Sequence, residues 1–343
     1  FDGGSDGSVN DAYRYMIDAA PLDWGGCCDH DNGAAREYSW WLLQKYTEAY
    51  LLAGRYTPLF NYERSVGYPD GHRNAIFARR GARPLPRLPT TGATVTPSPD
   101  TIFFYNYLGY FGGLDAAHST ATDQGTNWNA NNSTVETTVE IYQGARQSYE
   151  NQDTPRASAS CDTIDTYEPL GYVSNALQKG YQLGFESSSD HRSTHISYSN
   201  VWTTDSTRRG ILDAISKRRI YASTDLILAD VRMGDHFMGE AFTWTGQPTL
   251  SVALQGTGPF QEVHVVKDGL DMGLNWTTCP TNPSPTSVCF TWQDNTPMKS
   301  GDKHYYYVRG LQAGSALPQF PCEANARTSG AVVWTSPMWV TIQ

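Results

Sequence analysis

Histidine and carboxylate side chains recur in short polar clusters along the first two thirds of the chain, and together they are suited to hold catalytic metal ions. The candidate ligands are Asp2, His30, Glu63, His72, His118, Asp190 and His191, with Asp29 and His195 close behind. Mixed nitrogen and oxygen ligands suit Zn²⁺, Mn²⁺ or Fe²⁺ better than Ca²⁺ or Mg²⁺, which prefer all-oxygen shells. Such ions lower the pKa of bound water and polarise a phosphoryl or carbonyl oxygen. The residue types therefore predict a centre of two or three divalent ions that activates water.

Within this set, three residues are the candidates for catalysis: Glu63, His118 and Asp190. A carboxylate offers two oxygens, so Glu63 is suited to bridge two ions. A single histidine after a strand is more often a surface or capping residue than a ligand, and it is the number and order of the positions that favour a metal site. Arg64, Arg73 or Arg192 are candidates to hold an anionic substrate group, with surface salt bridges as the alternative for each.

The elements that must position these residues follow a repeated pattern of strand, polar cluster and helix. Hydrophobic periodicity predicts helices over 9–23, 35–52, 170–181 and 207–219, and a helix or strand over 101–112. Short apolar runs predict strands over 22–28, 57–63, 72–78, 135–142 and 182–190. Active-site groups of α/β barrels sit at the carboxyl ends of parallel strands, so the pattern predicts an α/β barrel with the polar clusters at one end.

The pattern changes after about residue 226, where short strands alternate with turns. Several of these strands alternate apolar and polar positions, which is typical of an antiparallel sandwich or a small β-domain. We therefore predict a barrel domain over 1–225 and a β-rich domain over 226–343. His264 and His304 lie in the second part without clustered carboxylates, which favours surface or core-edge roles over metal binding.

The charge balance argues against a nucleic-acid partner. The 343 residues include 25 Lys plus Arg against 35 Asp plus Glu, a formal net charge of −10. A phosphate backbone or an anionic membrane surface requires a basic protein face. A small phosphorylated substrate is compatible with this charge because metal ions supply positive charge locally. No apolar run approaches the roughly 18 residues that predict a membrane span.

The cysteines and the asparagine triplets favour export. Cys279 and Cys289 flank a turn rich in Pro, Asn, Ser and Thr, which predicts a disulfide across a hairpin. Asn131, Asn132 and Asn275 each begin an N-x-[ST] triplet, which permits glycosylation of an exported chain. We therefore predict a secreted, extracellular or periplasmic glycoprotein.

Several longer stretches carry a resemblance to a known superfamily. They are FDGGSDGSVNDAYRYMIDAAPLDWGGCCDHDNG, YERSVGYPDGHRNAIFARRG, HSTATDQGTNW, VEIYQGARQSYE, SSSDHRSTHISYSNVW, ILDAISKRRIYASTD and VVWTSPMWV. Spread over nearly the whole chain, they resemble an uncharacterised branch of PHP-like metallohydrolases (polymerase and histidinol phosphatase superfamily) that carry a domain of unknown function. The resemblance implies an α/β fold, namely a PHP-type distorted (β/α) barrel with a C-terminal antiparallel β-sandwich-like domain. It also implies a metal-dependent hydrolase, most often a phosphoesterase, acting on a small-molecule or extracellular substrate.

The resemblance assigns roles to residues of this chain. Asp2 resembles the acidic residue after the superfamily's first motif, and His30 matches the histidine that ends the second strand. Glu63 matches the bridging glutamate, and His72 and His118 resemble the two middle histidine ligands. Asp190 matches the final aspartate. The last histidine is ambiguous, because His191 follows Asp190 directly and His195 lies four residues further on.

The superfamily's first His-x-His pair does not occur in this sequence. Its strand either precedes Phe1, was removed, or was lost, and its loss would leave a strand edge open to a homo-oligomer or another assembly partner. This departure supports a second hypothesis, a catalytically degenerate extracellular structural or assembly subunit that retains the barrel. A third hypothesis, a carbohydrate-binding or sugar-processing module, rests on the 10 Trp and 21 Tyr residues.

Overall fold

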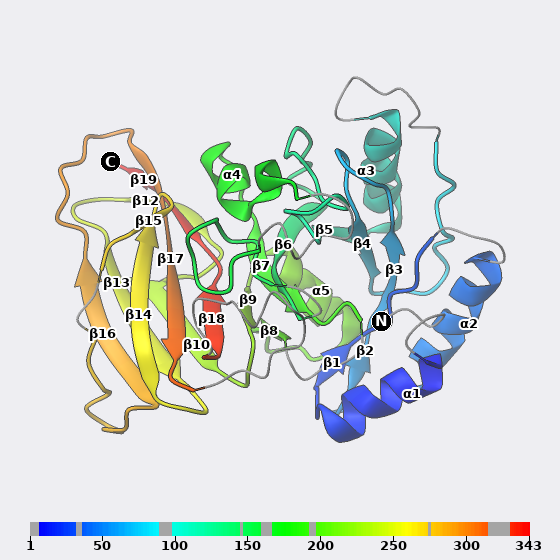
Figure 1. Cartoon of the computed structure of the whole chain (residues 1–343), viewed down its shortest axis with the longest axis horizontal. Helices are drawn as coiled ribbons and strands as arrows, with labels where there is room; N and C mark the ends of the chain where they lie inside the picture. Colours follow the sequence, from blue (N-terminus) through cyan, green and yellow to red (C-terminus); the bar gives the residue numbers. More distant parts are fainter. Residues whose placement is uncertain are drawn as a thin grey trace.

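The computed structural model describes residues 7–31, 36–88, 98–144, 147–158, 167–191, 197–273, 276–314 and 330–343. In Figure 1 the C-terminal strands lie on one side of the molecule, the strands of the first half lie in the middle, and helices α1 to α3 lie on the other side. Within these ranges the helices are α1 (Val9–Arg14), α2 (Arg36–Ala49), α3 (Pro99–Phe111), α4 (Val173–Gln178) and α5 (Arg208–Ser216). A π-helical segment, η1 (Tyr15–Ala19), continues α1, and a 3-10 turn, η2 (Pro169–Gly171), precedes α4.

A five-stranded sheet in the first half contains Glu63, and His72 and His118 lie directly beside the ends of its strands. Its order is β3 (Phe60–Arg64), β4 (Arg73–Phe77), β5 (Leu114–Ala117), β6 (Glu136–Gln143) and β7 (Gly184–Ser188). The pairs β3–β4 and β4–β5 are antiparallel, whereas β5–β6 and β6–β7 are parallel. A short parallel pair, β1 (Trp24–Gly25) with β2 (Thr57–Pro58), extends towards β3, and His30 bridges Glu63 in the same direction.

The predicted (β/α) barrel is wrong. Strands and bridges make up 36% of the described residues and helices only 19%, and the curled sheet closes about half of a barrel without a surrounding ring of helices. The physical reason is visible between β3 and β4. Only residues 65–72 separate them, and a parallel crossover needs a dozen or more residues, so the chain turns back as an antiparallel pair. The sequence pattern of strand and polar cluster was interpreted as parallel where these strands run in opposite directions.

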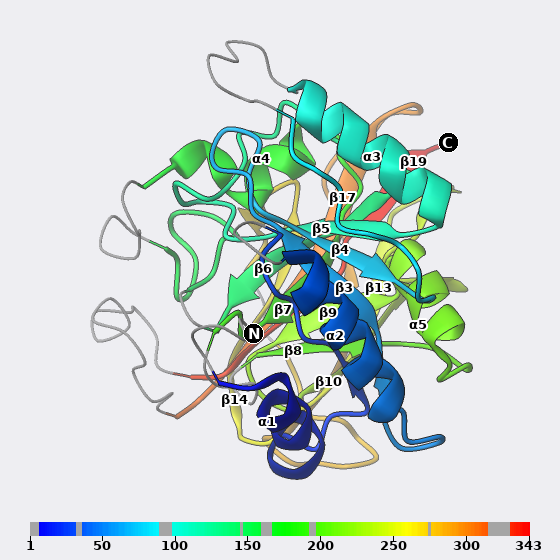
Figure 2. The same cartoon turned by 90° about the vertical axis from the view of Figure 1, so that its right-hand side faces the viewer.

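Helices cover one face of this sheet, as Figure 2 shows for α2 and α3. Local sequence signals define the start of α3. The Ser98 side chain accepts a hydrogen bond from the Thr101 N–H, and Pro99 occupies the first turn. At its end Gly112 adopts φ 65°, a left-handed conformation that favours glycine. Beneath the helices lies a core that includes Trp40, Leu43, Phe60, Tyr62, Phe77, Phe104 and Leu108.

The second half of the chain is built from strands. An eight-stranded sheet contains β8 (Tyr198–Val201), β9 (Ile220–Ser223), β12 (Ala241–Trp244), β14 (Phe260–Lys267), β15 (Leu270–Asp271), β17 (Lys303–Gln312), β18 (Val332–Thr335) and β19 (Met338–Ile342). A four-stranded sheet contains β10 (Leu228–Met233), β11 (His236–Phe237), β13 (Thr249–Gln255) and β16 (Ser287–Gln293). Among the described residues, the strand pairings in these two sheets are antiparallel except β12 with β19.

A buried carboxylate ties the two halves together. Glu150 accepts hydrogen bonds from the Tyr307 hydroxyl, the Arg309 guanidinium and the Trp334 indole, each at 2.6 Å. The larger sheet also joins strands β8 and β9 to β17, β18 and β19. The division into 1–225 and 226–343 stays a prediction.

The predicted disulfide between Cys279 and Cys289 is confirmed. Cys27 and Cys28 are free, while Cys161 and Cys322 lie outside the described residues. In the described part of the chain, no helix is both long enough and apolar enough to cross a membrane.

Candidate metal centre

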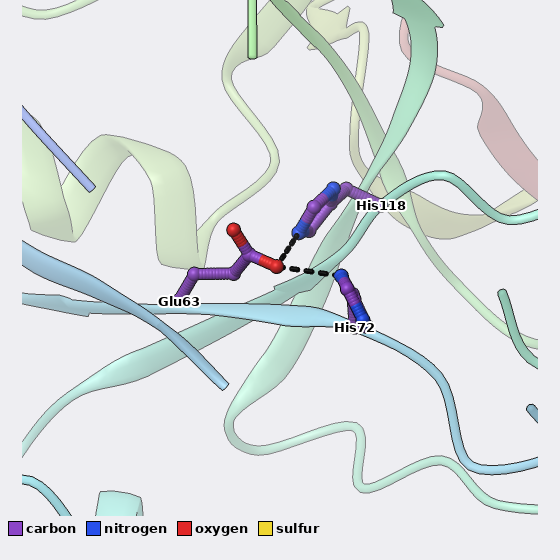
Figure 3. Close-up of side chains that lie close together, drawn as sticks. All are labelled: Glu63, His72 and His118. Carbon is purple, nitrogen blue, oxygen red and sulfur yellow. Dashed lines mark ion pairs between the residues drawn. The ribbon is translucent and has the colours of Figure 1, made fainter. Parts of the chain in front are cut away.

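Glu63 is the centre of the candidate site, and histidines approach both of its carboxylate oxygens. His72 Nδ1 lies 2.6 Å and His118 Nε2 3.5 Å from Oε1, as Figure 3 shows. His30 Nδ1 lies 3.1 Å from the other oxygen, Oε2. All three residues Glu63, His72 and His118 are buried, with exposed fractions of 3%, 8% and 3%. One ligand atom from each lies within 4.8 Å of the others, so this group could hold a metal ion.

Neighbouring strands place these residues at one end of the sheet. Glu63 lies in β3, His72 directly precedes β4, and His118 directly follows β5. Because β4 runs antiparallel to both neighbours, its start lies beside the ends of β3 and β5, which is why a histidine before one strand meets a histidine after another. The backbone joins the two histidines directly, since the His118 N–H donates to the His72 carbonyl at 3.2 Å.

Gly71 allows the chain to reach this position. Its φ is 87°, and a Cβ there would lie 2.6 Å from the carbonyl carbon of Gly125. Only glycine satisfies both the left-handed backbone and this close approach. The adjacent His72 N–H donates to the Gln124 carbonyl at 2.7 Å, which fixes the histidine against the 119–126 loop.

Electrostatics supports an ionised Glu63 facing a protonated His118. Burial works against ionisation of Glu63, but His118, His30 and His72 hold its pKa well below the usual range. Burial likewise lowers the pKa of His118, yet the carboxylates of Glu63, Glu140 and Asp190 outweigh it and raise that pKa to about 9. Burial lowers the pKa of His72, so this imidazole is neutral at pH 7. The cluster thus holds a proton where a cation would bind.

The remaining predicted ligands lie further out. His191 has its ring centroid 6.5 Å from that of His30, and its Nε2 lies 3.5 Å from Asp190 Oδ2. Both side chains are more exposed than the Glu63 group, at 35% and 15%. Asp2 and His195 lie outside the described residues, so their predicted roles stay predictions. The structure therefore brings His30, Glu63, His72 and His118 together and places Asp190 and His191 at the margin.

Two buried carboxylates that sequence reasoning missed lie behind His118. Glu140 in β6 accepts from the Ser119 N–H at 3.1 Å, and its Oε2 lies 4.0 Å from His118 Nδ1. Burial raises the pKa of Glu140 to about 8 and that of its neighbour Glu186 in β7 to about 7. Glu140 and Glu186 are register partners in the sheet. A carboxylate behind a ligating histidine orients the ring and makes it a better ligand.

The arginines proposed as anion binders are engaged elsewhere. Arg64 is buried, with its guanidinium 3.0 Å from Asp31 and 2.5 Å from Asp100. Arg73 is also buried, with Nε 3.2 Å from Asp115. These are internal ion pairs and not the surface salt bridges considered as the alternative. Arg192 lies outside the described residues.

The donor set fits a borderline divalent cation. Imidazole nitrogens with one carboxylate suit Zn²⁺, Mn²⁺ or Fe²⁺. His118 Nε2 is buried and makes no hydrogen bond in the described part of the chain, and its contact is the 3.5 Å approach to Glu63 Oε1. A metal ion between these two atoms would give the nitrogen a partner. No family model, curated protein or solved structure matches this chain at a significant level.

Proposed function

We propose that this chain is a metal-dependent hydrolase that acts on phosphoesters. The observation that carries the proposal is the buried Glu63 carboxylate, with imidazole nitrogens of His72 and His118 near one oxygen and of His30 near the other. A carboxylate that has histidines near both of its oxygens is suited to bridge two metal ions. The preference for phosphoesters rests on the resemblance of the sequence to PHP-like hydrolases and not on the geometry.

Each protein group has a definite task in this proposal. His72 and His118 would hold one ion together with Glu63, and His30 with Glu63 would hold a second. Bound ions would supply a water with lowered pKa and would polarise the phosphoryl oxygen. Glu140 and the Ser119 hydroxyl, 3.2 Å from His118 Nδ1, fix the ring so that Nε2 faces Glu63. Asp190 and His191 stand at the edge, where they would complete the coordination of an ion or meet substrate.

We also propose that the protein acts outside the cytoplasm. The Cys279–Cys289 disulfide is compatible with an extracellular location, because such bonds persist in oxidising compartments. Glycosylation of purified secreted material, measured by mass before and after enzymatic deglycosylation, tests this part.

Elemental analysis of the purified protein tests the central proposal. We expect two or three equivalents of Zn, Mn or Fe per chain after loading and dialysis, and hydrolysis of phosphate monoesters by the loaded protein. Glu63→Gln should lose the metal and the activity together, while Glu262→Gln, the same substitution in the C-terminal half, should keep both. A folded protein that takes up no metal would refute the hydrolase and favour the assembly subunit.

A further inference from the structure

A cavity of about 570 Å³ opens directly beside the metal cluster. Its inner end is lined by Glu63, His118, Glu186 and Asp190, so it is continuous with the candidate centre. Its volume is within the range of small-molecule sites. Any substrate whose reacting group reaches the cluster must place the rest of its structure in this space.

Beyond the cluster the cavity wall mixes apolar side chains with polar, mostly uncharged ones. Asparagine and serine residues such as Asn61, Asn200 and Ser197 line it, together with Trp24, Trp202 and several aliphatic residues. The other charged lining residues are Asp23 and Arg55, and both are exposed. No lysine lines the cavity within the described residues. Arg64 and Arg73 do not serve it, because both are locked in internal ion pairs.

Polar atoms along this wall lack hydrogen-bond partners. The buried Asn61 Oδ1, Ser197 Oγ and Glu186 Oε1 have none in the described structure. Asn61 lies two residues before Glu63 on β3, so both side chains point to the same side of the strand. Gly26 leaves room for the amide, since a Cβ there would lie 2.2 Å from Asn61 Oδ1. Buried acceptors are normally satisfied, so a ligand here is expected to bring hydrogen-bond donors.

We propose that this cavity binds the leaving group of the substrate and that this group is uncharged and rich in hydroxyls, like a sugar or another polyol. Hydroxyls supply the hydrogen bonds that Asn61 Oδ1 and Ser197 Oγ lack, and the apolar lining residues suit the C–H groups of a sugar. Outside the cluster, a second phosphate or a carboxylate would meet Arg55 as the one cation among the described lining residues, and Arg55 is exposed. Asp23, Glu186 and Asp190 line the same cavity and would repel the anion. That the bound molecule is a substrate rests on the proposed hydrolase function. The binding of hydroxyl-rich groups in the cavity does not depend on that function.

Two measurements on the full chain separate these statements. The first is saturation-transfer NMR on the metal-free protein with glucose and maltose against gluconate as the probe set. We expect binding of the neutral sugars and at least tenfold weaker binding of gluconate. The second is kcat/KM of the metal-loaded protein for glucose 6-phosphate against 6-phosphogluconate, in which C1 of the sugar is oxidised to a carboxylate. We expect at least a tenfold preference for the neutral substrate.

Substitutions in the cavity wall test whether its polar side chains bind the sugar. Asn61→Leu should weaken sugar binding and raise KM for glucose 6-phosphate about fivefold, as for one lost hydrogen bond, with metal content unchanged. Ser197→Ala repeats the test if Asn61→Leu does not fold. Asn295→Leu, the same substitution at an exposed asparagine, should change neither quantity. Absent sugar binding, equal binding of gluconate, or unchanged binding by both wall variants would overturn the inference. Sugar binding without hydrolysis of any phosphoester would overturn the hydrolase alone.

Discussion

The affinity of the cluster for a divalent cation should rise steeply with pH, because the cation must displace a proton from His118. The neighbouring carboxylates raise the pKa of this imidazole to about 9 against the effect of burial. A protonated imidazole has no free Nε2 lone pair to offer a metal. At pH 7 a group with that pKa is neutral in about one molecule in a hundred, which costs about 2.7 kcal/mol of binding free energy. At pH 8 the neutral fraction is about one in eleven, so the affinity should rise about ninefold.

Calorimetric titration of Zn²⁺ or Mn²⁺ into the metal-free protein at pH 6.5, 7.0, 7.5 and 8.0 measures this dependence. Repeating the titration in two buffers of different ionisation enthalpy counts the protons released, and about one per cation is expected from His118 at pH 7. Glu140→Gln removes one carboxylate that raises the pKa of His118. The affinity of this variant for the cation should therefore depend less on pH than that of the wild type. An affinity that stays constant from pH 7 to 8, without proton release, would refute the assigned protonation of His118.

Three further outcomes are expected. Glu63→Gln should lower kcat/KM about a thousandfold, because the lost ions contribute several kcal/mol of transition-state stabilisation; steady-state kinetics of both proteins after the same loading and dialysis checks this. Replacing Cys279 and Cys289 by serine opens a loop with a sequence separation of 10 and should lower the free energy of unfolding by about 2–3 kcal/mol, measured in urea, with unchanged metal content. Glu150→Ala leaves the buried Arg309 without its internal partner and should cost about 3–5 kcal/mol in the same urea assay. An unfolding midpoint within error of wild type would contradict either stability prediction.

Local signals in the sequence were sufficient to locate most elements of the first half. The helix predicted over 207–219 is α5 (Arg208–Ser216), where the Thr207 side chain accepts from the Gly210 N–H. The strand predicted over 135–142 is β6 (Glu136–Gln143). Apolar periodicity and capping residues act within a few residues of one another, so they can be recognised without knowledge of the fold.

The direction of neighbouring strands could not be recognised in this way. It depends on the length and path of connections, and the 65–72 connection brings β4 back against β3 as an antiparallel strand. The same turn delivers His72 to Glu63. His30, Glu63, His72 and His118, which lie together in the structure, are four members of the larger ligand set that the sequence predicts. The barrel that was expected to bring the set together is wrong.

Glu140 and Glu186, which were not predicted as site residues, lie in strands that are largely buried. Every residue of β6 is buried, so its two glutamates each need a compensating charge or proton. Glu136 has Arg73 Nε at 3.5 Å. Burial raises the pKa of Glu140 and of Glu186, and His118 is the cation that works against this rise. His118 also faces Glu63. Three buried carboxylates around one imidazolium leave an excess of negative charge, which protons relieve in the metal-free protein. As the pH rises, fewer protons remain to neutralise this negative charge, and a divalent cation neutralises it instead. The charge balance of the site and the arrangement of its histidines therefore favour the same ligand, a divalent cation.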